Sequence, residues 1–136
     1  MGKKDALKAY NSVNVSSNAA YADQVQLIQM LFDGLIESLD KTVGHIQRKE
    51  FKDKNETISR AQKIIFGLQM SLDMEKGGEL SRNLNELYEY AVKRLLHAHT
   101  RNDVDAVLEV KSLLNEVSGA WSMLPSLLKK KDIAAA

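Results

Sequence analysis

The stretch DQVQLIQMLFDGLIESLDKTVGHIQRKE, residues 23–50, carries the clearest helical pattern of this chain. Its apolar side chains recur at steps of three and four residues, which places them along one side of a helix. Asp23 can cap the start of that helix, with Gln26 three residues on to complete a capping box. Arg48 and Lys49 suit its C-terminal end. The apolar stripe consists of Leu27, Ile28, Leu31, Phe32, Leu35, Leu39, Val43 and Ile46.

The next stretch of the chain carries the same period. Asp53 followed by Glu56 is a second candidate capping box. Gly77 and Gly78 are expected to end this helix, because glycine readily takes the left-handed conformation found at helix C-termini. The stripe between these signals is Ile58, Ala61, Ile65, Leu68 and Leu72, with Ile64 on its flank.

Two more amphipathic helices are predicted after the glycine pair. The third ends near Arg101, and Asn102 or Asp103 can cap the fourth helix immediately. Pro125 ends or kinks the fourth helix, because proline has no backbone N–H to donate. The third stripe is Leu80, Leu84, Leu87, Ala91, Leu95 and Ala98, with Tyr88 beside it, and the fourth is Val107, Val110, Leu114, Val117, Trp121 and Leu124.

Four amphipathic helices joined by short links predict an all-α fold, an antiparallel four-helix bundle in up-down-up-down order. Residues 21–125 are expected to form this bundle. Residues 1–20 show no sustained period, and we expect them to be a flexible or loosely docked N-terminal arm. Residues 126–136, with the run KKK at 129–131, are expected to form a basic C-terminal tail.

The composition excludes several classes of protein. The 136 residues fit one domain, and 44% hydrophobic with 27% charged residues is an ordinary soluble balance. Cysteine is absent, so disulfides and thiol catalysis are excluded. A net charge of +1 gives no general attraction to nucleic acid or to anionic membranes. No secretory signal or run of about 20 apolar residues is present, so we expect a cytoplasmic protein without membrane insertion.

The sequence offers little for catalysis. Di-iron four-helix bundles need inward-facing Glu-x-x-His pairs, and none of His45, His97 and His99 follows a glutamate at that spacing. No Gly-x-Ser-x-Gly or phosphate-binding loop occurs. We therefore expect no catalytic, cofactor-binding or metal site, and a binding protein rather than an enzyme.

Methionine and aromatic side chains are the candidates for binding a partner. Methionine adapts to several ligands, although filling gaps in the core is the alternative for each one. Tyr88 and Tyr90 are two residues apart on a helix, so both can hardly be buried, and one could lie on a partner surface. Tyr10 and Val13 are the expected anchors of the arm. The full candidate set is Tyr10, Val13, Met30, Phe32, Asp33, Met70, Met74, Tyr88 and Tyr90.

Four motifs occur in a fixed order: MLFDG at 30–34, LDMEKGGELSRNL at 72–84, LYEY at 87–90 and AW at 120–121. Together they resemble the flagellar secretion chaperone FliS family, over roughly residues 10–124. Two departures stand out. Asp23-Gln24 replaces the usual Ser-Pro, and Ser81 stands where alanine is usual.

The resemblance implies a function. Chaperones of this family bind the disordered C-terminal segment of flagellin in the cytoplasm, along apolar grooves of the bundle, and so prevent premature filament assembly. The complex then goes to the flagellar export gate. The resemblance also implies an arm near the groove, which we expect to cover part of it. The alternatives are a bundle adaptor of another secretion or signalling system, a helical di-metal enzyme, and a histidine phosphotransfer bundle that presents His45 or His97. Whether the free protein self-associates stays open.

Overall fold

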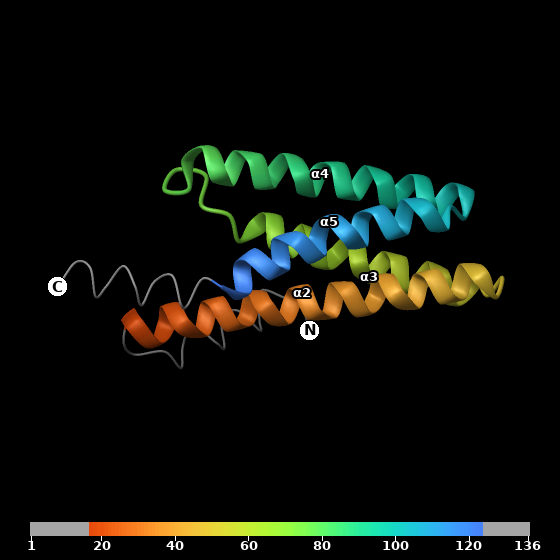
Figure 1. Cartoon of the computed structure of the whole chain (residues 1–136), viewed down its shortest axis with the longest axis horizontal. Helices are drawn as coiled ribbons and strands as arrows, with labels where there is room; N and C mark the ends of the chain where they lie inside the picture. Colours follow the sequence, from red (N-terminus) through yellow and green to blue (C-terminus); the bar gives the residue numbers. More distant parts are fainter. Residues whose placement is uncertain (1–16, 124–136) are drawn as a thin grey trace.

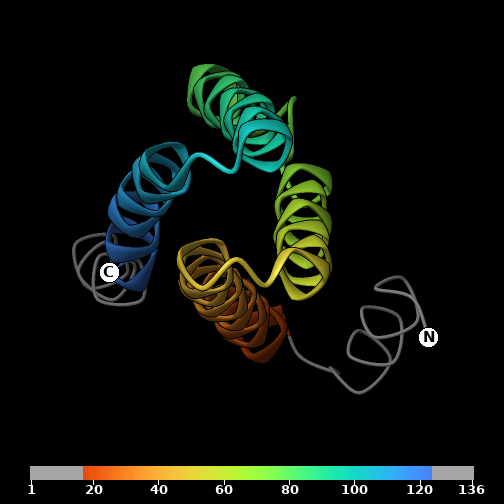
Figure 2. The same cartoon turned by 90° about the vertical axis from the view of Figure 1, so that its right-hand side faces the viewer.

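The computed structural model describes residues 17–123, with side chains from Asp23 onward. Within that range the chain forms four helices: α2 (Ser17–Gln47), α3 (Phe51–Met70), α4 (Gly78–Arg101) and α5 (Val104–Ser122). Each helix packs against the one before and the one after it, and α5 returns to α2, so the four form a ring (Figure 2). Successive helices run in opposite directions (Figure 1), which confirms the predicted bundle.

One side of each helix faces a shared core. The predicted stripes supply almost all of it, because residues spaced by three and four lie on the same side of a helix. Side chains from all four helices pack into one cluster, which lets a chain of this size fold without disulfides. Its largest fully buried apolar members are Phe32, Leu35, Leu39, Ile58, Ile65, Leu68, Leu95, Val107, Val110 and Leu114.

The starts of the first two helices differ from the sequence prediction. α2 begins at Ser17, before the predicted start at Asp23, so Asp23 lies inside the helix and does not cap it. The alanines at 19 and 20 have the highest helix propensity of any residue, which favours this longer helix. α3 begins at Phe51 after Glu50, so Asp53 lies in the first turn and makes no capping bond there.

Gly77 and Gly78 begin α4 and do not end α3, which stops at Met70. Gly78 has a φ of +53°, a conformation that glycine adopts without strain. A Cβ on Gly77 would lie 1.7 Å from Ser81 Oγ and 2.7 Å from the Asp73 carbonyl oxygen. The glycine pair is therefore needed to bring the 71–77 connection close to the first turn of α4.

The connection itself is organised by Asp73. Its carboxylate oxygen Oδ1 accepts hydrogen bonds from the backbone N–H groups of Glu75 at 3.1 Å and Lys76 at 2.9 Å. The Ser81 hydroxyl donates to the Asp73 carbonyl at 2.9 Å. The serine that departs from the family's usual alanine therefore fastens the connection to α4.

The connection between α4 and α5 follows the sequence prediction. Asn102 ends α4 in the left-handed conformation, with a φ of 53°. Asp103 caps α5, and its carboxylate accepts a hydrogen bond from the backbone N–H of Ala106 at 3.3 Å. None of the helices in the described range is long and apolar enough to cross a membrane.

Candidate partner-binding surface

Every methionine in the described part of the chain is exposed. Met30, Met70, Met74 and Met123 have exposed fractions of 63%, 66%, 46% and 61%. The alternative that these side chains fill gaps in the core is therefore wrong for all four. A long, unbranched thioether side chain on the surface can follow the shape of different apolar partners.

Three of these methionines lie at one end of the bundle, which we call the open end. It is the end where α2 and α4 begin and where α3 and α5 finish, on the left in Figure 1. Met70 is the last residue of α3, Met74 follows in the connection, and Met123 directly follows α5. Met30 lies on α2, in the half of the helix that leads to this end.

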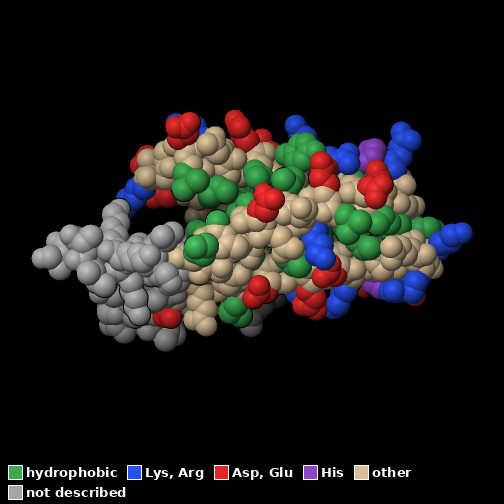
Figure 3. Space-filling model, in the orientation of Figure 1, with side chains coloured by type: hydrophobic (Ala, Val, Ile, Leu, Met, Phe, Trp, Pro, Cys, Tyr) green, Lys and Arg blue, Asp and Glu red, His purple; other side chains and the backbone are tan. Residues whose placement is uncertain are grey.

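The core stripes lose their cover towards the open end. On α4, Ala91 and Leu95 are fully buried, Leu84 and Leu87 are partly exposed, and Leu80 in the first turn is 67% exposed. Figure 3 shows hydrophobic side chains along the seam between α4 and α5, and a hollow where the two helices part. Leu80 was predicted to be a core residue, and this placement is wrong although its spacing is right.

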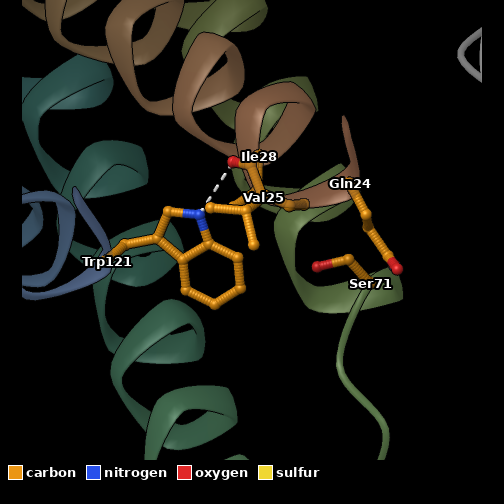
Figure 4. Close-up of a pocket in the computed structure, with 5 residues that line it drawn as sticks. All are labelled: Gln24, Val25, Ile28, Ser71 and Trp121. Atoms are coloured by element: carbon orange, nitrogen blue, oxygen red, sulfur yellow. Dashed lines mark hydrogen bonds between the residues drawn. The ribbon is translucent and has the colours of Figure 1, made fainter. Parts of the chain in front are cut away.

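A small cavity of about 130 Å³ lies at the open end between α2, the end of α3 and α5 (Figure 4). Gln24, Val25, Ile28, Ser71 and Trp121 line it. The Trp121 indole Nε1 donates a hydrogen bond to the Val25 carbonyl oxygen at 3.0 Å, which ties α5 to α2. One ring edge of the tryptophan faces this cavity, so Trp121 closes the bundle only in part.

Two of the predicted binding residues are core residues. Phe32 and Tyr88 are buried, at 1% and 3% exposure, and their burial removes them from the candidate surface. Burial raises the pKa of Tyr88 to about 12, because the phenolate would lose its hydration. Tyr90 is exposed, so the expectation that Tyr88 and Tyr90 could not both be buried is confirmed.

Tyr90 belongs to a polar cluster between α4 and α5. Its hydroxyl donates to Glu109 Oε2 at 2.9 Å, and Arg94 Nε donates to Glu109 Oε1 at 2.7 Å. The bonds from Tyr90 and then Arg94 lower the pKa of Glu109, since both stabilise the carboxylate. This tyrosine is therefore held in place by its own bundle, and only part of its ring is available to a partner.

Asp33 is exposed and accepts a hydrogen bond from Gln29 Nε2 at 3.3 Å. At the adjacent Gly34 a Cβ would make only ordinary van der Waals contacts with α3, at 3.4 Å from the Arg60 guanidinium and 3.6 Å from Ile64 Cδ1, so the packing of α2 on α3 does not require glycine there. Tyr10 and Val13 lie outside the described residues, and their role as anchors stays a prediction.

One group of possible metal ligands comes together at the opposite end. Atoms of His45, Glu50 and Asp53 lie within 4.8 Å of one another. Glu50 Oε1 is already bonded to His45 Nδ1 at 3.0 Å and to Arg48 Nε at 2.7 Å. A metal would have to displace the arginine, so the geometry is that of an ion-paired turn.

Several exposed apolar residues were not among the candidates predicted from the sequence. Phe66 is exposed and does not lie on the stripe formed by Ile58, Ala61 and Ile65. Its position relative to that stripe was enough to predict an exposed aromatic side chain. Leu80 gave no such signal, because it lies on its stripe and only the ending of the neighbouring helices exposes it.

Comparisons with known proteins agree with the motifs. Residues 6–127 match the family described as flagellar protein FliS. The flagellar secretion chaperone FliS of Salmonella typhimurium is 43% identical over 119 residues, which cover 87% of this chain and 88% of the relative. FliS of Escherichia coli is 41% identical over 126 residues, or 90% of this chain and 93% of that protein. The secretion chaperone FliSB of Pseudomonas aeruginosa is 40% identical over 116 residues, or 85% and 92%. The family match includes all four helices of the bundle, and this chain belongs to the FliS family of flagellar proteins.

Proposed function

We propose that this chain is a flagellar secretion chaperone that binds the C-terminal segment of flagellin in the cytoplasm and keeps it from assembling before export. The observation that carries the proposal is the open end, where a FliS-family bundle presents exposed methionines beside an uncovered apolar stripe. No covalent step is involved, and the family is one of chaperones and not of enzymes.

The physical basis is coupled folding and binding. A disordered client segment loses conformational entropy when it is ordered, and burial of apolar surface has to offset that cost. The exposed Met70, Met74 and Leu80 supply such surface without the bundle having to open. Because methionine side chains are adaptable, the surface can follow a segment that becomes helical only when bound.

We also propose that the loaded chaperone is delivered to the flagellar export gate. The relatives are named as secretion chaperones, which supports a role that ends at a secretion apparatus. Cytoplasmic domains of the export gate, immobilised and offered free or flagellin-bound chaperone, should retain the loaded form more strongly. Equal retention of both forms would contradict delivery.

Self-association is the competing use of the same surface. Two copies could bury Met70 and Met74 against each other when no client is present. Sedimentation of the free protein over a range of concentrations would show a dimer, and addition of the flagellin segment should then dissociate it. A dimer that persists with bound flagellin would place self-association on another face.

Substitutions at the open end test the location of the site. Met70→Glu and Met74→Glu should weaken flagellin binding, because each places a charge in an apolar contact. Leu96→Glu on α4 is the matched control, since Leu96 is similarly exposed, at 57%, and lies in the half of α4 away from the open end. In a pull-down with flagellin, the two Met variants should retain less flagellin than the wild type, and the Leu96 variant should retain as much. Equal loss in the control, or full binding by the Met variants, would contradict this location.

A further inference from the structure

The open end leaves an apolar stripe uncovered within the described residues. Leu72 in the α3–α4 connection, Leu84 on α4, and Val117 and Trp121 on α5 are partly exposed, and Leu80 on α4 is largely exposed. All five continue the stripes whose other members are buried further along α3, α4 and α5. An apolar surface of this kind is ordinarily covered, either by more of the same chain or by a partner.

The rim of this surface is acidic. Asp73, Glu75 and Glu79 lie in the α3–α4 connection and the first turn of α4, and all three are exposed. Lys76 is the one basic residue among them, so the rim carries net negative charge. Whatever covers the stripe would therefore gain from carrying positive charge next to its apolar residues.

The segment that follows α5 has this pattern. Residues 124–131 read LPSLLKKK, with three leucines followed by three lysines. The described chain ends at Met123, two residues after Trp121, so the segment starts beside the uncovered surface. Eight residues reach at most about 26–29 Å when extended, which is enough to span the open end of a small bundle. The family match runs to residue 127 and so includes the leucines.

We propose that residues 124–131 fold back over the open end. Leu127 and Leu128 lie on the apolar stripe next to Trp121 and Leu80, and the three lysines face the acidic rim. Pro125 allows the reversal, because proline interrupts the helix that would otherwise carry the chain straight on.

The N-terminal arm fits this position less well. Ser17 lies eight residues before Val25 on α2, so the helix carries the start of the arm about 12 Å beyond the cavity. Its apolar residues Leu7, Tyr10 and Val13 are also spread singly, and no run of lysines follows them, because the lysines of the arm stand at positions 3, 4 and 8. The arm can still lie on another part of the client groove.

Trp121 is the single tryptophan of the chain and reports directly on this cover. In the full-length protein without flagellin, Leu127→Ser combined with Leu128→Ser should shift the Trp121 emission to the red and increase its quenching by acrylamide. Ile133→Ser is the matched control, because it removes an apolar side chain beyond the lysines, and its spectrum should equal that of the wild type. Replacing Lys129, Lys130 and Lys131 by Glu should increase quenching at low salt.

Truncation after Met123 and deletion of residues 1–16 complete the test. The truncated chain should show the same red shift, and a peptide of residues 124–136 added in excess should reverse it. Circular dichroism checks that each variant is folded. If the truncated chain does not fold, the leucine variants test the proposal instead. An unchanged spectrum in the leucine variants, or a red shift produced only by deleting residues 1–16, would overturn the proposal.

A fold-back of residues 124–131 over the open end would also affect flagellin binding, an expectation that rests on the proposed function. Because Leu80 and its neighbours belong to the proposed client surface, residues 124–131 would compete with flagellin, and the leucine variants should bind flagellin more tightly. The fluorescence test contains no flagellin, so its failure would leave the proposed function untouched. Tighter binding without a red shift would contradict the cover itself.

Discussion

Trp121 shows how a single side chain serves both the bundle and its surface. Its indole N–H donates to Val25 on α2, while part of the ring borders the cavity at the open end. The AW motif in the sequence marks the residue, and its stripe places it on the inner side of α5. Its partial exposure depends on where the neighbouring helices end. The spacing of apolar residues in the sequence gives no information about those ends.

Replacing Trp121 should separate its two contributions to stability. Trp121→Phe removes the hydrogen bond to Val25 and should lower the free energy of unfolding by about 1 kcal/mol. Trp121→Ala also removes the ring and should cost about 2–3 kcal/mol, below the ~3–5 kcal/mol for a fully buried large aromatic side chain. Urea unfolding followed by circular dichroism measures both. An unchanged midpoint in the alanine variant would show that the ring contributes nothing to the bundle.

Asp103 links stability to pH at the start of α5. The backbone hydrogen bond from Ala106, with a smaller contribution from His97, lowers the pKa of this carboxyl below its ordinary value of 3.8. A group whose pKa is lower in the folded state stabilises fully above its unfolded pKa and loses that effect as the pH falls through the folded value. Stability should therefore decline at acid pH, below about pH 4 for this group.

Asp103→Asn tests this assignment, because asparagine can still cap the helix but does not titrate. The variant should lose less stability than the wild type between about pH 5 and pH 2, as measured by thermal unfolding. Parallel pH profiles for the two proteins would show that the Asp103 carboxyl does not contribute to acid unfolding.

At the scale of helices, the sequence correctly predicted that four helices exist in the described residues and in which order they follow. It predicted poorly where the individual helices begin and end. The stripes predicted which side of each helix is buried, because a buried side carries apolar residues at helical spacing. The ends depend on contacts between segments. Gly77 lies at the start of α4, where Ser81 and Asp73 leave no room for a side chain. No local sequence pattern distinguishes such a glycine from one that ends α3. Asn102 and Asp103 were placed correctly because their capping is local.

Each neighbouring pair of helices is also joined by a polar contact. These contacts fix the register between helices, because a hydrogen bond has stricter geometry than apolar packing. They could not be predicted from one sequence, since each needs the alignment of two helices. They are Thr42 to Thr57 at 2.8 Å, Gln69 to Asn85 at 3.2 Å, Arg94 to Glu109 at 2.7 Å and Lys111 to Asp40 at 2.7 Å.

Buried Lys54 joins the start of α3 to the end of α4. Its ammonium donates to the His99 carbonyl at 3.0 Å and to Asn102 Oδ1 at 2.7 Å. Lys54→Met keeps most of the side-chain volume and removes both bonds, so it should destabilise the bundle by about 1–3 kcal/mol. Lys52→Met, at an exposed neighbouring position, should have little effect. Equal denaturation midpoints for both variants would contradict this role.

Two glycines should respond to alanine in opposite directions. Gly77→Ala should destabilise the protein, because the new Cβ would overlap Ser81 and the Asp73 carbonyl. Gly119→Ala should stabilise it by up to about 1 kcal/mol, since that site lies inside α5 with open space around it and alanine is the better helix former. The two melting temperatures should therefore fall on either side of the wild-type value. A neutral Gly77→Ala would show that the connection can relax.

At the scale of the whole molecule, the sequence predicted the bundle and the family, but only part of the surface. Met30, Met70 and Met74 were predicted as candidates and are exposed, whereas Phe32 and Tyr88 were predicted with them and belong to the core. A residue type shows what a side chain can bind, and only the packing of all four helices shows whether a partner can reach it. The open end exists because the stripes of α4 and α5 continue past the point where α3 stops covering them.

The proposed function requires that this chain binds the C-terminal segment of flagellin. Isothermal titration calorimetry at several temperatures, with full-length flagellin and with flagellin lacking that segment, measures this binding. We expect a one-to-one complex with the full-length protein, a negative heat-capacity change because apolar surface is buried, and no complex with the shortened protein. Equal binding of both flagellins, or binding of neither, would show that this chain does not recognise the C-terminal segment.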